Sequence, residues 1–358
     1  MKAFKLNLPA VLFNAVMALL ITVLMGGDIV MAGATFTGLV VLSFVPMPKG
    51  MALMGLNKEV WTQDIVDNLY ANNEFAKKSV DDSPFVVQGS IVHRASAGSA
   101  STITKNNTSF PVSVSRRSDS DINYSLDAYR SNPSLVLNIE NYELAYDKRQ
   151  SVLGEDQRNL IQYCMVGLLY NWGPAGTSYV KRTSGGTVDA NLSGATGNRK
   201  AFHKDELGSV KVSMDETDVP VLGRIALLNA RHHQEFIDSL SDGERTGFYA
   251  AADLKNGIVG RWMGFDIMMR STVLRYRGAD DSETKVDTQD SGYAAGASDR
   301  KGSLIWQQDS VARGEGAITM FDRTNDPTYY GDIYSFEMRF GGKIRRTAGV
   351  YAVVDAVV

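Results

Sequence analysis

The sequence has few of the residues that build covalent frameworks and metal centres. Its 358 residues include one cysteine, Cys164, and four histidines. One cysteine cannot form an intramolecular disulfide framework, and it excludes the zinc sites that are built on cysteine. Cys164 lies in the apolar run QYCMVGLL, so we predict a buried structural cysteine rather than a reactive thiol. A cytoplasmic location agrees with this low cysteine content.

The chain also lacks an excess of charge and the common nucleotide-binding motifs. Its 37 basic and 40 acidic side chains give a net charge of −3, which provides no global basic field for nucleic acid. Neither GxGxxG between a strand and a helix nor GxxxxGK[ST] occurs. The glycine-rich stretch SGGTVDANLSGATG has no such strand and helix around it. With 44% apolar and 22% charged residues, the composition is that of an ordinary globular protein.

The histidine pair lies in ARHHQEFIDSL, residues 230–240. On a helix His232 and Glu235 would share one face, as metal-ligand pairs do. However, His232 and His233 would diverge by about 100 degrees, and the spacing is not HExxH. The other two histidines, His93 and His203, are distant in sequence. We therefore predict a solvated helix face here, with no catalytic, cofactor-binding or metal-binding residues.

Long apolar runs occur only at the N-terminus, in residues 1–54. LPAVLFNAVMALLITVLMGG follows Lys2 and Lys5, and MAGATFTGLVVLSFVPMP comes next. One such run is about long enough to span a bilayer, and the two lysines are typical of a signal or an anchor. Membrane contact of residues 1–50, removal of this segment, and its burial all remain open.

Two alternating segments predict a long arm. Residues 84–98 and 110–130 alternate apolar and polar side chains, as strands do, and the segment between them is small and polar. An isolated hairpin is marginally stable, so the arm needs a surface to lie on. The chain offers no obvious one, and a neighbouring copy would serve. Residues 57–79, which precede the arm, have the spacing of an amphipathic helix.

Beyond the arm the pattern indicates an α+β chain. A long helix is predicted within residues 142–172, because five apolar residues recur at intervals of seven, four, four and four: Leu153, Leu160, Cys164, Leu168 and Trp172. Residues 173–200 are rich in glycine, serine and threonine and predict a long loop. The further predictions are helices at 204–218, 230–240 and 301–314, a buried strand at 224–229, two strands in 257–276 broken at Gly260 and Gly264, a strand at 317–322, and two strands around a turn at Gly341–Gly342.

Six stretches, taken in order, carry a resemblance. They are LNKEVWTQDIVDNLYANNEF, SRRSDSDINYSLDAYRSNPSLVLNIE, ELAYDKRQSVLGEDQRNLI, DETDVPVLGRIALLN, GRWMGFDIMMRS and DPTYYGDIYSFEMRFGGKIRR. Over residues 55–358 the chain resembles the major capsid proteins of tailed bacteriophages, which have the Hong Kong 97-like fold. The order of these stretches carries the resemblance, and none of them is a catalytic motif.

The resemblance implies a layout for the whole chain. After an apolar N-terminal segment, 1–54, it implies an N-terminal arm, 55–85, an extended loop, 86–136, a peripheral domain with a spine helix, 137–205, an axial domain, 206–324, and C-terminal strands of the peripheral domain, 325–358. Some relatives crosslink subunits through a lysine and an asparagine. Lys105 and Asn106 lie near the arm tip, but no motif assigns them a bond.

The implied function is a structural one. Copies of the chain would assemble through pentamers and hexamers into an icosahedral head shell around double-stranded phage DNA, without sequence-specific contact. The partners implied are portal, scaffold or decoration proteins, and the location is the virion, assembled in the host cytoplasm. The resemblance implies no enzyme activity and no cofactor. The basic group Arg339, Lys343, Arg345 and Arg346 would be a solvated face or would contact acidic partners.

Three other functions compete with this one. An encapsulin-like nanocompartment of the host would use the same fold to hold enzymes in place of DNA. A metal-dependent enzyme would use the helix with His232 and His233. A membrane-anchored surface protein would depend on residues 9–46.

Overall fold

The computed structural model describes residues 73–87, 90–96, 103, 105–108, 110–111, 120–137, 148–192, 195–278 and 284–358. The chain divides into two units, residues 1–60 and 61–358, and every described residue belongs to the second. The apolar segment 1–54, with the question of its membrane contact, lies outside the described residues. Of the helix predicted at 57–79, the structure describes the end, α4 (Glu74–Lys77). Within the described ranges no helix is both long enough and apolar enough to cross a membrane.

A five-stranded sheet forms around one long hairpin. β16 (Val311–Asp326) and β17 (Gly331–Ile344) pair antiparallel, and their side chains alternate between the two faces as strand geometry requires. β17 turns Tyr334, Phe336, Met338 and Phe340 to the buried face. The other strands of this sheet are β1 (Val80–Asp81), parallel to β16, and β5 (Asp127–Arg130) and β6 (Ser134–Leu137), both paired with β17.

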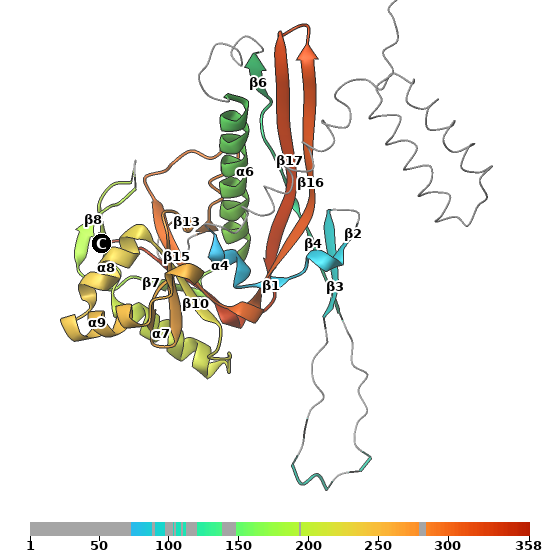
Figure 1. Ribbon diagram of the computed structural model, residues 1–358. Coiled ribbons are helices and arrows are strands. Elements are labelled where there is room, and N and C mark those ends of the chain that lie inside the picture. Colours follow the sequence, from blue (N-terminus) through green and yellow to red (C-terminus); the bar gives the residue numbers. More distant parts are fainter. Residues whose placement is uncertain are drawn as a thin grey trace, which may run out of the picture. The chain divides into compact units, whose positions relative to one another are not determined.

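The predicted long helix is confirmed as α6 (Lys148–Trp172), which lies along the hairpin (Figure 1). All five residues that predicted it are buried, Cys164 included. Its last residue, Trp172, reaches the sheet at Gly342, where an added Cβ would lie 2.6 Å from the indole Nε1. The predicted turn at Gly341–Gly342 is therefore wrong. Both glycines lie inside β17, and Gly342 is required there for close packing, not for a turn.

An eight-stranded sheet separates two apolar cores. Its central strand is the predicted buried strand, β10 (Arg224–Asn229), confirmed with every residue buried. Because alternate residues point to opposite faces, Ile225 and Leu227 join the core beneath α6, whereas Ala226 and Leu228 join a second core. The other strands are β7 (Val180–Arg182), β11 (Ile258–Trp262), β12 (Phe265–Arg270), β13 (Leu274–Arg277), β14 (Thr284–Lys285), β15 (Asp299–Gln307) and β18 (Val350–Val354).

Three helices contribute to the second core (Figure 1). Two of them were predicted and are confirmed, and the third was not predicted, although Ser241 and Glu244 form the capping box that marks its start. They are α7 (Lys204–Glu216), α8 (Ala230–Ser239) and α9 (Asp242–Ala250). The described residues also include four short 3-10 helices, at Ser83–Phe85, Leu254–Asn256, Gln308–Ser310 and Thr347–Gly349.

Three further predictions are corrected by the structure. The helix at 301–314 is wrong, because these residues form most of β15 and the start of β16. The second half of β15 is covered on both faces and contains the apolar run LIW, so it lacks the alternation that separates strand from helix. The loop at 173–200 contains strands β7, β8 (Thr187–Asp189) and β9 (Asn198–Lys200). Residues 257–276 form three strands, and Gly260 lies at a bulge inside β11, not at a break.

The two predicted strands of the arm are confirmed at its root. β3 (Ile91–Ser96) pairs antiparallel with β4 (Ser120–Ser125), and β2 (Val86–Val87) adds a third strand. Val92 and the residue after β4, Leu126, are buried against Gly314 of β16. The prediction that the arm finds no surface in its own chain is therefore wrong for the root, because the long hairpin supplies one.

Candidate assembly surfaces

One member of the histidine pair, His232, belongs to a buried polar network, whereas His233 is half-buried and its Nε2 has no hydrogen-bond partner among the described residues. His232 is fully buried, so the predicted solvated face is wrong for this residue. Its Nδ1 lies 2.8 Å from Ser303 Oγ, and its Nε2 lies 3.0 Å from Asp355 Oδ1. Since the helix begins at Ala230, capped by the Asn229 side chain, its first turn directs His232 onto the sheet. Both ring nitrogens of His232 therefore contact groups of the chain itself.

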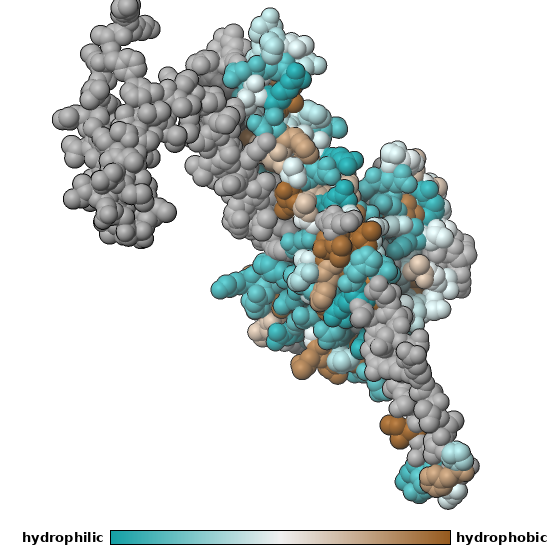
Figure 2. Space-filling view, turned by 90° about the vertical axis from the view of Figure 1, so that its right-hand side faces the viewer, coloured by the Kyte–Doolittle hydropathy of each residue, from teal (hydrophilic) through white to brown (hydrophobic). Residues whose placement is uncertain are grey.

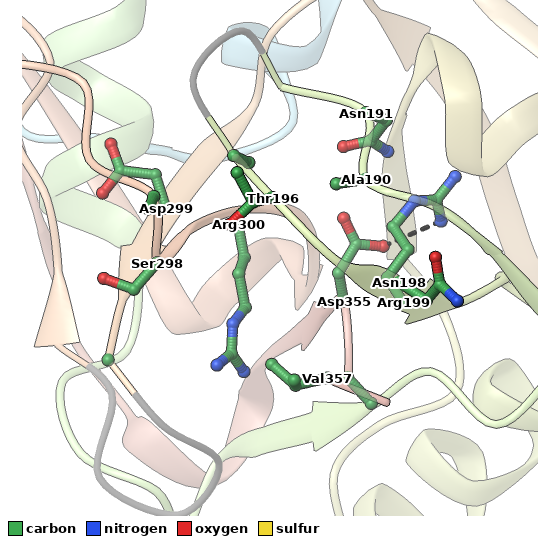
Figure 3. A pocket seen from close by; sticks show the side chains of 14 residues that line it. Ala190, Asn191, Thr196, Asn198, Arg199, Ser298, Asp299, Arg300, Asp355 and Val357 are labelled. Carbon is green, nitrogen blue, oxygen red and sulfur yellow. Dashed lines mark hydrogen bonds and ion pairs between the residues drawn. The ribbon is translucent and has the colours of Figure 1, made fainter.

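Arg199 and Asp355 carry this network to the surface (Figure 3). Arg199 donates hydrogen bonds to Asp355 Oδ1 over 3.0 Å and to Glu235 Oε2 over 3.1 Å. Burial lowers the pKa of Arg199, but the hydrogen bonds and charges of Glu235 and Asp355 outweigh it and hold the pKa above its usual range. Arg199 and Asp355 line a pocket of about 520 Å³. Glu235 thus pairs with Arg199.

The network attaches the last residues of the chain to β9. The Lys200 amide donates to Ala356 O over 3.0 Å, and the Val358 amide donates to Asn198 O over 3.2 Å. Asp355 therefore connects α8, β9 and the final residues, which is a structural role. Among the described residues no group of three or more His, Cys, Asp or Glu side chains is placed to hold a metal ion.

Cys164 has the environment of a structural thiol. Burial raises its pKa to about 12, so almost no thiolate exists at neutral pH. Its Sγ lies 3.8 Å from Met338 Sδ within the core beneath α6. The predicted buried structural cysteine is confirmed.

The arm root presents an apolar surface to solvent. Phe85, Val87 and Ile91 are large, apolar and exposed, and Val87 pairs directly with Ile91 across β2 and β3. The opposite face of this small sheet carries the buried Val92. We refer to Val87 and Ile91 as the arm-root surface; the ring of Phe85 instead lies against the Arg94 guanidinium, with Arg94 Cζ 5.4 Å from the ring centroid. One face of the root is thus packed on its own chain, and the other face is available to a partner.

A second exposed surface is the face of the five-stranded sheet that turns away from α6. Phe321 is 51% exposed there, and Leu135, also exposed, lies opposite Ile333 across β6 and β17. Charged side chains continue the same face, where Arg130 Nε lies 3.2 Å from Glu337 Oε2. On the side of the molecule in Figure 2, apolar patches lie within a largely polar surface.

The third surface surrounds the turn between β11 and β12. Leu222 is 86% exposed, and Val212, Val221 and Met263 are also exposed; Val212 lies on α7 one helical turn after Gly208, where an added Cβ would lie 3.8 Å from Met263 Sδ. An added Cβ on Gly264 would lie 3.6 Å from Val221 Cγ1, which places the 219–223 turn against the β11–β12 turn. We refer to Val212, Val221, Leu222 and Met263 as the turn surface. Clustered exposed apolar residues of this kind are typical of protein–protein contacts.

The sequence-predicted basic group is divided by the fold. Arg339 Nε lies 3.8 Å from Glu337, and Lys343 donates to Asn123 O over 3.0 Å. Burial lowers the pKa of Arg345. These side chains therefore contact their own subunit in part and do not form one continuous basic patch. Lys105 and Asn106, named for a crosslink, are exposed in the described part of the arm.

Sequence reasoning did not identify the exposed apolar residues, since it cannot separate an exposed leucine from a buried one. A weak signal was present for the turn surface. Val221 and Leu222 stand between Pro220 and Gly223, and a turn flanked in this way tends to lie at the surface.

Comparison with known proteins identifies the fold. No family model and no curated protein matches the chain. Among solved structures, the capsid of Ralstonia phage GP4 is similar with a TM-score of 0.55 and 13% identity, over 76% of this chain and 85% of that one. The capsid of cyanophage P-SCSP1u has a TM-score of 0.50 and 13% identity, over 77% and 86%. A chain of Mycobacterium phage Che8 has a TM-score of 0.50 and 16% identity, over 78% and 90%.

These similarities cover most of each chain, and at such low identity they concern the fold. The chain has the α+β fold of tailed-phage capsid proteins, as the resemblance in its sequence implied.

Proposed function

We propose that this chain is the major capsid protein of a tailed phage, which assembles through pentamers and hexamers into an icosahedral head shell. The observation that carries the proposal is the capsid fold, matched over most of the chain. The three exposed apolar surfaces support it, because a monomer rarely leaves several such clusters in water.

Assembly would bury these surfaces repeatedly. Burial of apolar area contributes about 25 cal/mol per Å², and a stable interface buries on the order of 1,600 Å² in total. A shell subunit makes several interfaces at once, so modest contacts add up to a stable particle. The arm-root surface lies on a projecting hairpin, which suits a contact that extends onto a neighbouring copy.

The layout implied by the resemblance becomes part of the proposal. Residues 55–85 would form the N-terminal arm and 86–136 the extended loop. Residues 137–205 and 325–358 would form the peripheral domain, with α6 as its spine. Residues 206–324 would form the axial domain around the five-fold and six-fold centres. The turn surface would then contact neighbouring copies around these centres.

The shell would enclose double-stranded DNA without reading its sequence. A net charge of −3 suits a container that must release its contents, since strong backbone binding needs a basic surface. Portal, scaffold or decoration proteins would be further partners, and the protein would be found in virions assembled in the host cytoplasm. We assign no catalytic, cofactor-binding or metal-binding residue.

The test is electron microscopy of the full-length chain after expression and purification. Closed uniform shells, or rings of five and six subunits, would support the proposal. A monomer at every protein and salt concentration would refute self-assembly. Shells that hold folded enzymes and no nuclease-protected DNA when isolated from their native host would favour the encapsulin-like alternative.

A further inference from the structure

The arm joins the rest of the molecule through two short stretches. Residues 82–85 lead from β1 into β2, and Leu126 alone separates β4 from β5. β1 and β5 belong to the five-stranded sheet, whereas β2, β3 and β4 form a sheet of their own. The Leu126 amide donates to Ser90 O over 2.8 Å, so the arm is closed at its base. A change in the angle of the arm must therefore occur at residues 82–85 and at Leu126.

Leu126 lies over a place where the long hairpin has no side chains. Gly314 and Gly341 are direct partners across β16 and β17. An added Cβ on Gly314 would lie 3.1 Å from Leu126 Cδ2 and 3.2 Å from Val92 Cγ2. We refer to Gly314 and Gly341 as the socket. Apolar contact with it is non-directional, so it holds the arm root without setting an angle.

Asp82 makes most of the directional contacts, and Lys343 of β17 adds a hydrogen bond to Asn123 O on β4 over 3.0 Å. Its side chain accepts hydrogen bonds from the Arg94 guanidinium and, over 3.3 Å, from the Tyr124 hydroxyl. Asp82 is 1% exposed, and its own amide donates to Arg313 O over 2.8 Å. Arg94 lies on β3 and Tyr124 on β4. One carboxylate thus connects both long strands of the arm to the body.

The residues before Asp82 are fixed to the body by Arg313. Its guanidinium donates to Ser79 O over 3.2 Å and to Asp81 Oδ2 over 3.1 Å. The backbone is therefore held to the body up to Asp82, and the Ser83 side chain accepts a further hydrogen bond from the Glu315 amide over 3.0 Å. Burial, together with the charge of Asp82, raises the pKa of Tyr124, so its hydroxyl remains a donor at physiological pH.

We infer that Asp82 is a latch that sets the angle of the arm, and that the contact of Leu126 with the socket is the pivot about which the arm turns when the latch opens. Opening breaks the bonds to Arg94 and Tyr124, while the apolar contact at the socket persists. The inference deepens the proposed function. A closed shell needs one chain to fit both flat and curved settings, and a hinge with one latch supplies that difference.

Distance measurement on unassembled full-length protein tests the latch. Spin labels would be placed at Asn123→Cys on β4 and Tyr163→Cys on α6, both exposed positions, while the native Cys164 is buried and unlabelled. We expect a single narrow distance distribution in the parent protein and one at least twofold broader with Asp82→Asn. The matched control is Asp81→Asn, which weakens the contact to Arg313 but keeps an amide oxygen that can accept the Ser83 amide, as the carboxylate does over 2.9 Å, and it should leave the distribution narrow. Equal widths for Asp82→Asn and the parent would overturn the inference.

A second pair of variants tests the pivot. Gly314→Val places a branched side chain under Leu126 and should shift the mean distance without broadening it. The control is Gly243→Ala on α9, outside the socket, where an added Cβ has no atom within 4 Å, so the mean should not change. An unchanged mean in Gly314→Val would exclude the socket as pivot.

Failure of the latch and failure of the proposed function are separable. Amide hydrogen exchange of α6 shows whether the body of Asp82→Asn is folded. Tyr124→Phe removes one hydrogen bond and no charge, so it should broaden the distance distribution less than Asp82→Asn does. If the parent protein forms no shells but the distance distribution broadens in Asp82→Asn, the latch is supported and the proposed shell function is refuted. Shells together with an unaltered arm would refute the latch alone.

Discussion

The indole Nε1 of Trp172 lies 2.8 Å from the carbonyl oxygen of Ala312, and this hydrogen bond joins the end of α6 to the start of β16. Trp172 also packs against Trp306 of β15, with ring centroids 5.5 Å apart. The helix, the long hairpin and the eight-stranded sheet therefore meet at one buried side chain.

Trp172→Phe should destabilise the protein more than another tryptophan substitution does. The unpaired Ala312 carbonyl costs about 1–3 kcal/mol, in addition to the loss of ring volume. The control is Trp262→Phe, since the buried Nε1 of Trp262 has no hydrogen-bond partner among the described residues. Urea unfolding measures both free energies. Equal losses would show that the bond to Ala312 contributes nothing.

Gly342→Ala should be strongly destabilising, while Gly341→Ala should not. A Cβ on Gly342 would lie 2.5 Å from Ala312 O and 2.6 Å from Leu168 Cδ1, so α6 or β16 must move. Overpacking of this kind costs about 1–3 kcal/mol. The neighbouring glycine offers ordinary contact at 3.4 Å. Thermal unfolding of the two variants would decide, and an equal shift in Tm would contradict this explanation of the glycine pair.

Glu244 should contribute to acid stability. Hydrogen bonds from Lys204 and from Ser241 hold its pKa at about 2, below the ordinary 4.5. A carboxylate with a depressed pKa in the folded state stabilises above pH 4.5, and this stability is lost as the pH falls toward 2. Glu244→Gln should therefore show a smaller loss of stability over that window than the parent protein. The control is Glu216→Gln at the exposed end of α7, and a parent-like pH profile for Glu244→Gln would contradict the prediction.

Leu222→Asp should abolish assembly and leave folding intact. Leu222 belongs to the turn surface, where a charge would be buried without a partner on contact with another copy. Leu254→Asp is the matched control, because Leu254 is 77% exposed but lies on a separate 3-10 helix. Light scattering and electron microscopy would measure assembly, and circular dichroism would measure folding. Shells formed by Leu222→Asp in normal yield would remove the turn surface from the proposed contacts.

The sequence was sufficient to predict elements whose burial shows in the spacing of their own apolar residues. The spacing of Leu153, Leu160 and Leu168 indicated a helix with one buried face, and α6 has it. The stretch GSLIWQ was assigned to a helix because β15 is covered on both faces and shows no alternation. Gly341 and Gly342 inside β17 were interpreted as a turn, since the sequence does not show that Leu126 packs on the first and α6 on the second.

The contacts of the candidate functional residues could not be predicted from the sequence, because they join residues that are far apart along the chain. The partners of His232 are Ser303 and Asp355, 71 and 123 residues away along the chain, so its burial depends on the complete fold. The arm was predicted by alternation, but its latch joins Asp82 to Tyr124 across 42 residues. Spacing in the sequence reports neighbours within one element and not contacts made between elements.

The position of strand β10 determines how the described part of the chain unfolds. Its residues alternate between two cores, Ile225 and Leu227 in one and Ala226 and Leu228 in the other. Neither core can be exposed to water without displacing β10, which covers one side of the other core. The body should therefore melt in one calorimetric transition, with a van't Hoff enthalpy equal to the measured enthalpy. Under internal pressure, a shell of such subunits would yield at the contacts between copies before any single copy lost half of its structure.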